Sequence, residues 1–296
     1  MTQAYTLAGA SVHDLEAPSG AVYRLLLYVP VGLPPALGWP LLMMTDGNSC
    51  FGTAVDALRA QADYPKSSNV GWGVVAALGY PTENAYDPLR RSWDLSPPPG
   101  RRYPPFTSGG PEVRTGGADE FLDFIESRVI PFITSRVKID LTQRTLFGHS
   151  FGGLFGLYTL FRRPALFQRI VAVSPTIHWE DCTLLRSEAQ AEFNVPIRPT
   201  VYLSAGEHEG DQLAPFQEKQ DDASDRLAKK KLERTIDFAR EMAERLRDPN
   251  GANLSANFEI FADHTHMSVP TPATARAVQV AFALDQHPTN GTALVF

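Results

Sequence analysis

Cysteine is scarce in this sequence, and long apolar runs are missing. The chain has two cysteines among 296 residues, Cys50 and Cys182, which lie far apart and match no metal-ligand spacing. We therefore expect neither a disulfide framework nor a metal site. No stretch of about 18 consecutive apolar residues occurs, so we predict no membrane-spanning helix.

An excess of positive charge is also lacking. Lys and Arg together number 27 against 33 Asp and Glu, and the net charge of −6 gives no reason to expect a nucleic acid or an anionic membrane as partner. The first residues, Met-Thr-Gln-Ala-Tyr, contain no basic region followed by an apolar core, as a signal peptide would. We therefore expect a cytoplasmic protein, and the sequence leaves its oligomeric state open.

What the sequence does contain is an alternation of strand-like and helix-like segments. With 43% apolar and 20% charged residues, the composition is that of an ordinary globular protein. The strand-like runs are short and apolar, and they lie at 21–29, 41–45, 70–78, 145–147, 169–173, 200–204 and 258–261. This order predicts an α/β fold, with a mainly parallel central sheet covered by helices on both faces. We expect one domain over residues 1–296.

Three further segments have their own patterns. Residues 80–117 are so rich in proline that we expect no regular element there, and we interpret the segment as a loop insertion over the active site. Residues 221–247 predict one long amphipathic helix, whose Lys229-Lys230-Lys231 run faces solvent. A last helix is expected to begin near Pro272, with Thr271 as its cap.

The sequence Gly148-His149-Ser150-Phe151-Gly152 stands between a short strand and an apolar helix. Gly-x-Ser-x-Gly in this setting is typical of the nucleophile elbow of α/β-hydrolases. The serine occupies a strained turn, and the residues two before and two after it come so close that only glycine leaves room. Ser150 is therefore the predicted nucleophile.

A serine hydroxyl needs a base, and the base is commonly oriented by a carboxylate. In this fold the chain order is serine, acid, histidine. His264 and His266 follow the last predicted strand, where the base is expected. Glu209 and Glu207 follow the strand that ends at Ser204, and Glu209 is the better candidate because it comes three residues after the turn glycine Gly206.

The oxyanion of such a reaction needs two backbone N–H donors. We expect one from Phe151, next to the nucleophile, and one from Gly47 or Asn48, in the turn after the 41–45 strand. Chemistry of this kind requires no metal and no organic cofactor.

Several motifs resemble an esterase branch of the α/β-hydrolases. They are Asp46-Gly47-Asn48, Gly79-Tyr80, Arg91-Ser92-Trp93-Asp94-Leu95-Ser96-Pro97, Ser108-Gly109-Gly110, the extended elbow through Phe155, and Ser174-Pro175. Their order and spacing, from about residue 22 to 285, are similar to those of the enterobactin and salmochelin trilactone esterases. This resemblance favours His266 over His264, because His266-Met267-Ser268-Val269 matches the family's His-x-Ser-Val context. It also implies that the acid is dispensable in some members.

Two residues are candidates for contact with substrate. Arg91 would hold an anionic group of the substrate, or instead form a salt bridge with Asp94 three residues later, which we favour. His149, next to the nucleophile, is the second candidate.

Together these features predict a serine esterase that hydrolyses a small-molecule carboxylic ester through an acyl-enzyme on Ser150. The resemblance implies a siderophore trilactone or a related ester as substrate. Two alternatives stay open: an acyltransferase that uses the same triad, and a binding module that keeps the α/β-hydrolase fold without turnover.

Overall fold

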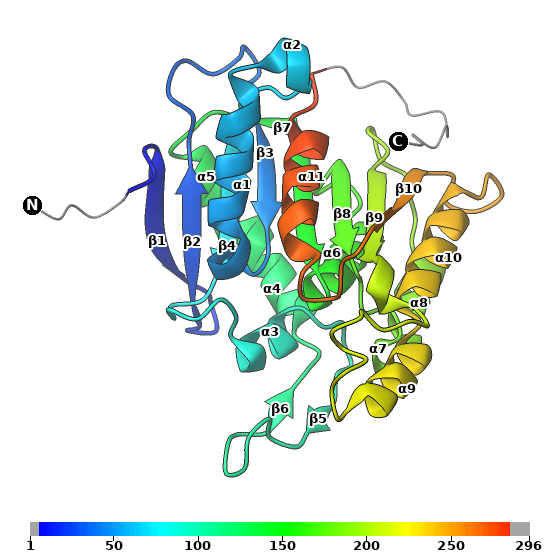
Figure 1. The fold of residues 1–296 in the computed structure, drawn as a ribbon. Helices are drawn as coiled ribbons and strands as arrows, with labels where there is room; N and C mark the ends of the chain where they lie inside the picture. The colour runs from blue at the N-terminus through cyan, green and yellow to red at the C-terminus, as the bar shows by residue number, and fades with distance from the viewer. Residues whose placement is uncertain (1–5, 285–296) are drawn as a thin grey trace, which may run out of the picture.

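A computed structural model of the chain describes residues 6–284, and its centre is one eight-stranded sheet (Figure 1). The strand order is β1-β2-β4-β3-β7-β8-β9-β10. Strand β2 pairs antiparallel with both of its neighbours, whereas all other pairs in this sheet are parallel. The predicted mainly parallel α/β fold is therefore confirmed. The strands are β1 (Ala10–Glu16), β2 (Val22–Tyr28), β3 (Trp39–Met44), β4 (Val74–Gly79), β7 (Ile139–His149), β8 (Arg169–Val173), β9 (Thr200–Gly206) and β10 (Ser255–Phe261).

Helices cover both faces of this sheet, which explains the uninterrupted apolar runs of its central strands. In β3, Leu41 and Met43 belong to one hydrophobic core, and Leu42 and Met44 belong to the other. The second core is closed by α1 (Gly47–Ala62) and α11 (Pro270–Phe282). The first core is closed by α4 (Ala118–Phe124), the π-helical turn η1 (Ile125–Val129), α5 (Ile130–Thr134), α6 (Phe151–Arg162) and α10 (Thr235–Arg247).

The proline-rich segment contains regular structure, so the expectation of none there is wrong. Helix α3 (Pro88–Asp94) begins with proline, at the position where a missing N–H costs nothing, and the Asp87 side chain caps it by accepting from Arg90 N. A two-stranded hairpin follows, β5 (Arg102–Tyr103) with β6 (Val113–Arg114). In Figure 1 this hairpin projects from the end of the molecule at which the parallel strands finish.

The single long helix expected over 221–247 is also wrong, because the chain forms two helices. Helix α9 (Ala223–Glu233) ends at Arg234, whose φ of 45° lies in the left-handed region, and α10 then begins. Helix α10 buries one face against the sheet, whereas α9 buries no residue. No glycine or proline in the sequence marks this break. We attribute it to packing, because α10 packs against the sheet and α9 does not.

Smaller differences concern the ends of the sheet and the last helix. Strand β1 escapes the sequence pattern because it is an edge strand with mostly exposed, polar residues. Helix α11 begins at Pro270, two residues before the predicted start, and Val269 rather than Thr271 occupies the cap position. The remaining short helices are α2 (Pro65–Ser68), α7 (Trp179–Cys182), α8 (Leu184–Ala189) and η2 (Glu207–Glu209).

Within residues 6–284, no helix has both the length and the apolar character needed to cross a bilayer.

Candidate active site

The turn between β7 and α6 has the backbone of a nucleophile elbow. Ser150 sits there with φ 59° and ψ −116°, a backbone conformation that residues other than glycine rarely adopt. Gly148 and Gly152 lie against each other, and a Cβ on Gly148 would lie 2.1 Å from the Gly152 carbonyl oxygen. The two glycines are therefore required for the chain to turn here and lift the serine off the sheet.

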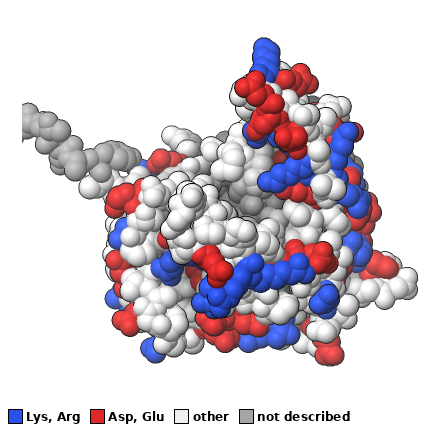
Figure 2. Space-filling model, turned by 90° about the horizontal axis from the view of Figure 1, so that it is seen from below, with Lys and Arg blue, Asp and Glu red and all other residues white. Residues whose placement is uncertain are grey.

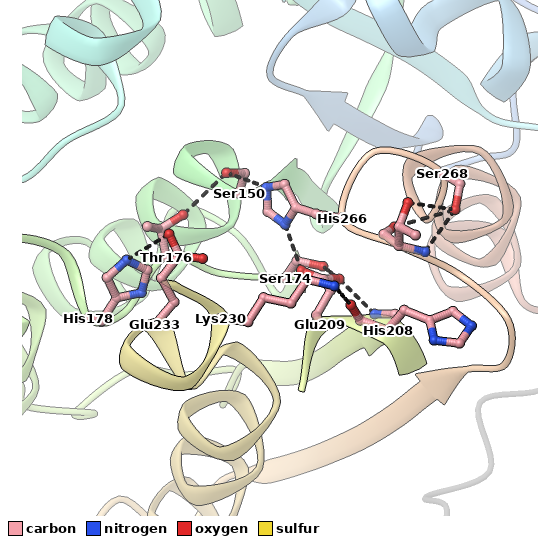
Figure 3. Close-up of polar contacts among 12 residues, drawn as sticks. Ser150, Ser174, Thr176, His178, His208, Glu209, Lys230, Glu233, His266 and Ser268 are labelled. Atoms are coloured by element: carbon pink, nitrogen blue, oxygen red, sulfur yellow. Dashed lines mark hydrogen bonds and ion pairs between the residues drawn. The ribbon is translucent and has the colours of Figure 1, made fainter. Parts of the chain in front are cut away.

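The loop between β10 and α11 brings His266 to this serine (Figure 3). His266 Nε2 lies 3.0 Å from Ser150 Oγ, and its Nδ1 lies 2.6 Å from Glu209 Oε2. His264 points elsewhere, and its Nδ1 contacts Ser268 Oγ at 3.1 Å. Of the two histidines that the sequence leaves open, only His266 meets the serine.

Glu209 is buried, with 3% of its surface exposed, and the fold holds its carboxylate by both oxygens. Oε1 accepts from Gly206 N at 2.7 Å and from Ser174 Oγ at 2.5 Å, while Oε2 faces His266. These donors leave the carboxylate one orientation. Glu207, the alternative acid, accepts from Asp263 N and does not contact His266.

The residues expected to bind an oxyanion start two helices. Phe151 is the first residue of α6, where the helix presents unpaired N–H groups and the positive end of its dipole. Gly47 and Asn48 start α1, and a Cβ on Gly47 would collide with the backbone of Ala77 at 2.8 Å. The Asn48 side chain is engaged elsewhere, since it accepts from Tyr80 N and donates to two carbonyls after β4. That these backbone N–H groups bind an oxyanion stays a prediction.

Arg91 makes a contact that the sequence did not indicate. Its Nε and Nη2 donate to the two carboxylate oxygens of Asp46, each at 2.9 Å. The favoured salt bridge with Asp94 is therefore wrong: Asp94, one turn further along α3, accepts instead from the hydroxyl of Tyr23. Contact of Arg91 with substrate stays a prediction.

His149 is buried against the proposed base. Its ring centroid lies 4.5 Å from that of His266. Burial, and secondarily the neighbouring His266 and Arg91, hold the pKa of His149 well below its usual value, so the ring is neutral. Its Nε2 has no hydrogen-bond partner among the described residues. The structure thus places the ring of His149 against that of His266, and its expected contact with substrate stays a prediction.

A pocket of about 580 Å³ opens at Ser150. Its walls combine aromatic and basic side chains from the elbow, α7, the segment before α9 and α9 itself; they include Phe151, Trp179, Phe216, Arg226, Lys229 and Lys230. Figure 2 shows this end of the molecule, where charged side chains of both signs surround a hollow. A second pocket, of about 850 Å³, lies between the β1–β2 turn, α3 and α4 and contains no residue of the Ser150 site.

Sequence reasoning missed several residues of this site. Thr176 Oγ1 lies 3.2 Å from Ser150 Oγ, and Ser174 binds the acid as described above. Both follow β8, and polar residues just after the strand beside the elbow are the signal that would have found them. Lys230 is half-buried and donates to the His208 carbonyl and to Gln217, so the expectation that the whole Lys229-Lys230-Lys231 run faces solvent is wrong at this residue.

In the described part of the chain, one group of three side chains could hold a metal ion. Ligand atoms of Glu207, His208 and Asp263 lie within 4.8 Å of one another, on the loops that carry the acid and the base. Both carboxylates are exposed, and such groups are common without an ion, so we assign no metal to them.

Comparisons with known proteins show which proteins this chain is similar to. The model of a family described as "Putative esterase" matches residues 19–240. The ferri-bacillibactin esterase BesA of Bacillus subtilis is 30% identical over 290 residues, which cover 96% of this chain and 93% of that protein. The siderophore triacetylfusarinine C esterase of Aspergillus fumigatus is 42% identical over 154 residues, which cover 51% of this chain and 49% of that protein.

Solved structures give the same result for the fold. The siderophore hydrolase EstB from Aspergillus nidulans superposes with a TM-score of 0.82 at 27% identity, covering 97% of this chain and all of that one. The BES protein from Bacillus cereus superposes with a TM-score of 0.79 at 26% identity, covering 95% of this chain and 99% of that one.

Proposed function

This chain belongs to the esterase family whose model spans most of it, and from that premise we propose that it is a serine esterase acting through an acyl-enzyme on Ser150. The observation that carries the proposal is the continuous contact from Ser150 Oγ through His266 to the buried Glu209. A serine hydroxyl becomes a useful nucleophile at neutral pH when an imidazole accepts its proton.

In the first half of the reaction, Ser150 Oγ attacks the ester carbonyl while His266 Nε2 accepts the hydroxyl proton. The Glu209 carboxylate keeps the proton on Nδ1, so that Nε2 is the free acceptor, and it stabilises the imidazolium that forms. His266 then passes the proton to the leaving alcohol, and the acyl group stays on Ser150.

In the second half, water attacks the carbonyl of the acyl-enzyme while His266 accepts a proton from the water. The bond between the acyl carbon and Ser150 Oγ then breaks, the carboxylic acid leaves, and His266 returns the proton to Ser150 Oγ. The tetrahedral oxyanion of both halves would be bound by Phe151 N–H together with Gly47 or Asn48 N–H. An alcohol or thiol in place of water would make the enzyme an acyltransferase, and product analysis with added acceptors separates the two.

We propose a siderophore ester, of the trilactone type or related to it, as the substrate class. Support comes from the relatives, which are named as esterases of ferri-bacillibactin and of triacetylfusarinine C. The pocket at Ser150 is wide enough for part of a bulky substrate, and its aromatic and basic walls suit polar ring systems or anionic groups.

The test compares Ser150→Ala with the unchanged protein on p-nitrophenyl butyrate and on an enterobactin-type trilactone. Because the nucleophile is lost, kcat/KM should fall roughly 10⁴-fold or more on both substrates. Ser67→Ala, at an exposed position of α2, is the matched control and should keep full activity. Full turnover by Ser150→Ala would exclude the mechanism, and faster turnover of the simple ester than of the trilactone would exclude the substrate class.

The same assay decides the role of the acid. Glu209→Gln keeps the shape but loses the charge facing His266, and we expect kcat to fall roughly 10²- to 10⁴-fold. Glu207→Gln, two residues away and exposed, is the control. Equal activity of the two variants would mean that Ser150 and His266 act as a dyad.

A further inference from the structure

The connection that follows β8 contains a run of residues with an unusual backbone. Glu180, Asp181 and Cys182, in α7, have φ values of 47°, 57° and 58°. These values lie in the left-handed region, which residues other than glycine enter rarely and then one at a time. Strained backbone of this kind persists only where the surrounding structure holds it, and it is concentrated at active sites and ligand sites. The run therefore needs both a holder and a purpose.

The proline-rich hairpin lies against this run at the same end of the molecule (Figure 1). Glu180 Oε1 accepts from the hydroxyl of Tyr103 in β5 at 3.1 Å and from Thr115 Oγ1, directly after β6, at 2.6 Å. Thr115 is buried, and its hydroxyl accepts from Arg101 N at 2.7 Å, which fixes it. The pair of Arg101 with Asp181 is exposed and contributes little. Glu180 is therefore the residue through which the hairpin holds α7.

The residue before this run is a tryptophan that faces the nucleophile's pocket. Trp179 lines the pocket at Ser150 and packs edge-on against Phe151, with the ring centroids 4.8 Å apart. The ring of Tyr103 lies 5.3 Å from the indole, so three aromatic rings connect the hairpin to the residue next to the nucleophile. Phe216, 60% exposed, lines the same pocket. The pocket thus offers large apolar ring surfaces to the group that lies beside Ser150.

We propose that Trp179 is a specificity-determining residue that favours esters with an aromatic ring or a similarly large flat group beside the reacting bond, and that Glu180 is the positioning residue that holds it there. This inference rests on the proposed esterase function and deepens it by naming a chemical class of substrate. A flat ring against an indole buries apolar surface and gains from the contact between rings, whereas a short aliphatic group leaves the indole in water. The hairpin then acts on selectivity rather than on the chemical step.

The test compares kcat/KM within two matched pairs of esters. The pair p-nitrophenyl phenylacetate and p-nitrophenyl acetate places the ring on the acyl side, and the pair benzyl butyrate and ethyl butyrate places it on the alcohol side. The unchanged protein should favour the ring-bearing ester in at least one pair. In Trp179→Ala that preference should fall roughly 10- to 30-fold, because the ring loses its partner, while turnover of the small ester stays within about 3-fold.

Two substitutions complete the test of the tryptophan. Trp179→Phe keeps a ring and should keep most of the preference. Phe106→Ala, at an exposed position of the hairpin outside the pocket, is the matched control and should behave like the unchanged protein. If Trp179→Ala does not fold, Trp179→Leu, which keeps apolar volume without a ring, answers the same question.

A further pair of variants separates positioning from stability. Glu180→Gly and Asp181→Gly both put glycine at a left-handed position, which suits that backbone. Only the first removes the carboxylate that Tyr103 and Thr115 bind. Since a side chain that is no longer held must be ordered by the substrate, the preference should fall roughly 3- to 10-fold in Glu180→Gly. It should stay within about 2-fold in Asp181→Gly. A merely structural role would change both esters of a pair alike.

Circular dichroism gives the folded fraction of each variant, and Ser150→Ala is measured in parallel. An unchanged protein without preference in either pair, or with the same preference as Trp179→Ala, would overturn the role of Trp179. Equal losses in Glu180→Gly and Asp181→Gly would overturn that of Glu180. Activity retained by Ser150→Ala would refute the esterase function itself, a separate outcome.

Discussion

Helices α3 and α9 both carry neighbouring positive residues, yet they are held in different ways. Arg90 and Arg91 of α3 are engaged with buried partners: Arg90 lies over the rings of Tyr23 and Tyr80, and Arg91 pairs with Asp46. Helix α9 buries no residue. Its Lys229 is paired with Glu233, four residues on, at the surface.

The comparison shows that the contribution of neighbouring charged residues to the fold depends on whether their partners are buried or exposed. Ion pairs at the surface contribute little free energy, whereas a buried charge must be matched by a partner or it destabilises the fold. We therefore expect α3 to be held firmly against the rest of the fold and α9 to be held weakly. Three predictions test this contrast.

The largest effect is expected at Asp94 of α3. Burial raises the pKa of its carboxyl to about 6 from 3.8, despite the hydrogen bond from Tyr23. The folded protein then binds this proton more tightly than the unfolded chain does. The free energy of unfolding should therefore decrease as pH rises through this window, by roughly 3 kcal/mol. In Asp94→Asn this contribution should vanish, as urea unfolding from pH 4 to 8 would measure.

The matched control for this prediction lies on α9. Asp225→Asn removes an exposed carboxylate and should leave the pH dependence of stability as it is in the unchanged protein. If Asp94→Asn and the unchanged protein had parallel stability curves, α3 would not carry a buried titrating group, and the contrast would fail on that side.

A smaller effect is expected at Lys230, the residue that ties α9 to the acid loop. Its Nζ donates to the His208 carbonyl at 2.5 Å and to Gln217 Oε1 at 2.9 Å. Lys230→Met keeps the length of the side chain but loses both bonds. We expect a loss of about 1 kcal/mol in the free energy of unfolding and faster cleavage near α9 by subtilisin. Lys231→Met, on the same helix and exposed, should change neither measurement.

The smallest effect is expected at the surface pair Arg226–Asp222, four residues apart and joined at 2.6 Å. Arg226→Gln should change the free energy of unfolding by less than about 0.5 kcal/mol, because solvent and salt screen an exposed pair. Thermal unfolding at low and high salt measures it. A loss above about 1.5 kcal/mol would mean that α9 is held as firmly as α3.

The sequence predicted the features that depend on neighbouring residues. The elbow around Ser150 was predictable because the strained turn at the serine brings the residues two positions before and after it so close that both must be glycine. The mainly parallel sheet follows from the alternation of strands and helices, and the meeting of Glu209 with His266 follows from the rule that loops at one sheet edge converge.

Features that depend on contacts between segments far apart in the chain could not be predicted from the sequence. Nothing near Arg91 in the sequence indicates Asp46 as its partner, because 45 residues separate them and Asp94 is close by. Likewise, the left-handed turn at Arg234 is marked by no glycine. Its cause is that the sheet takes up α10 and leaves α9 outside, which only the folded arrangement reveals.

That turn at Arg234 has a consequence for how such a protein can diversify. The chain from Phe216 to Glu233 supplies much of the wall around Ser150, yet it ends at one backbone hinge and contributes α9, which buries none of its residues. Sequence changes along α9 can therefore alter the wall of the pocket at little cost to the hydrophobic core.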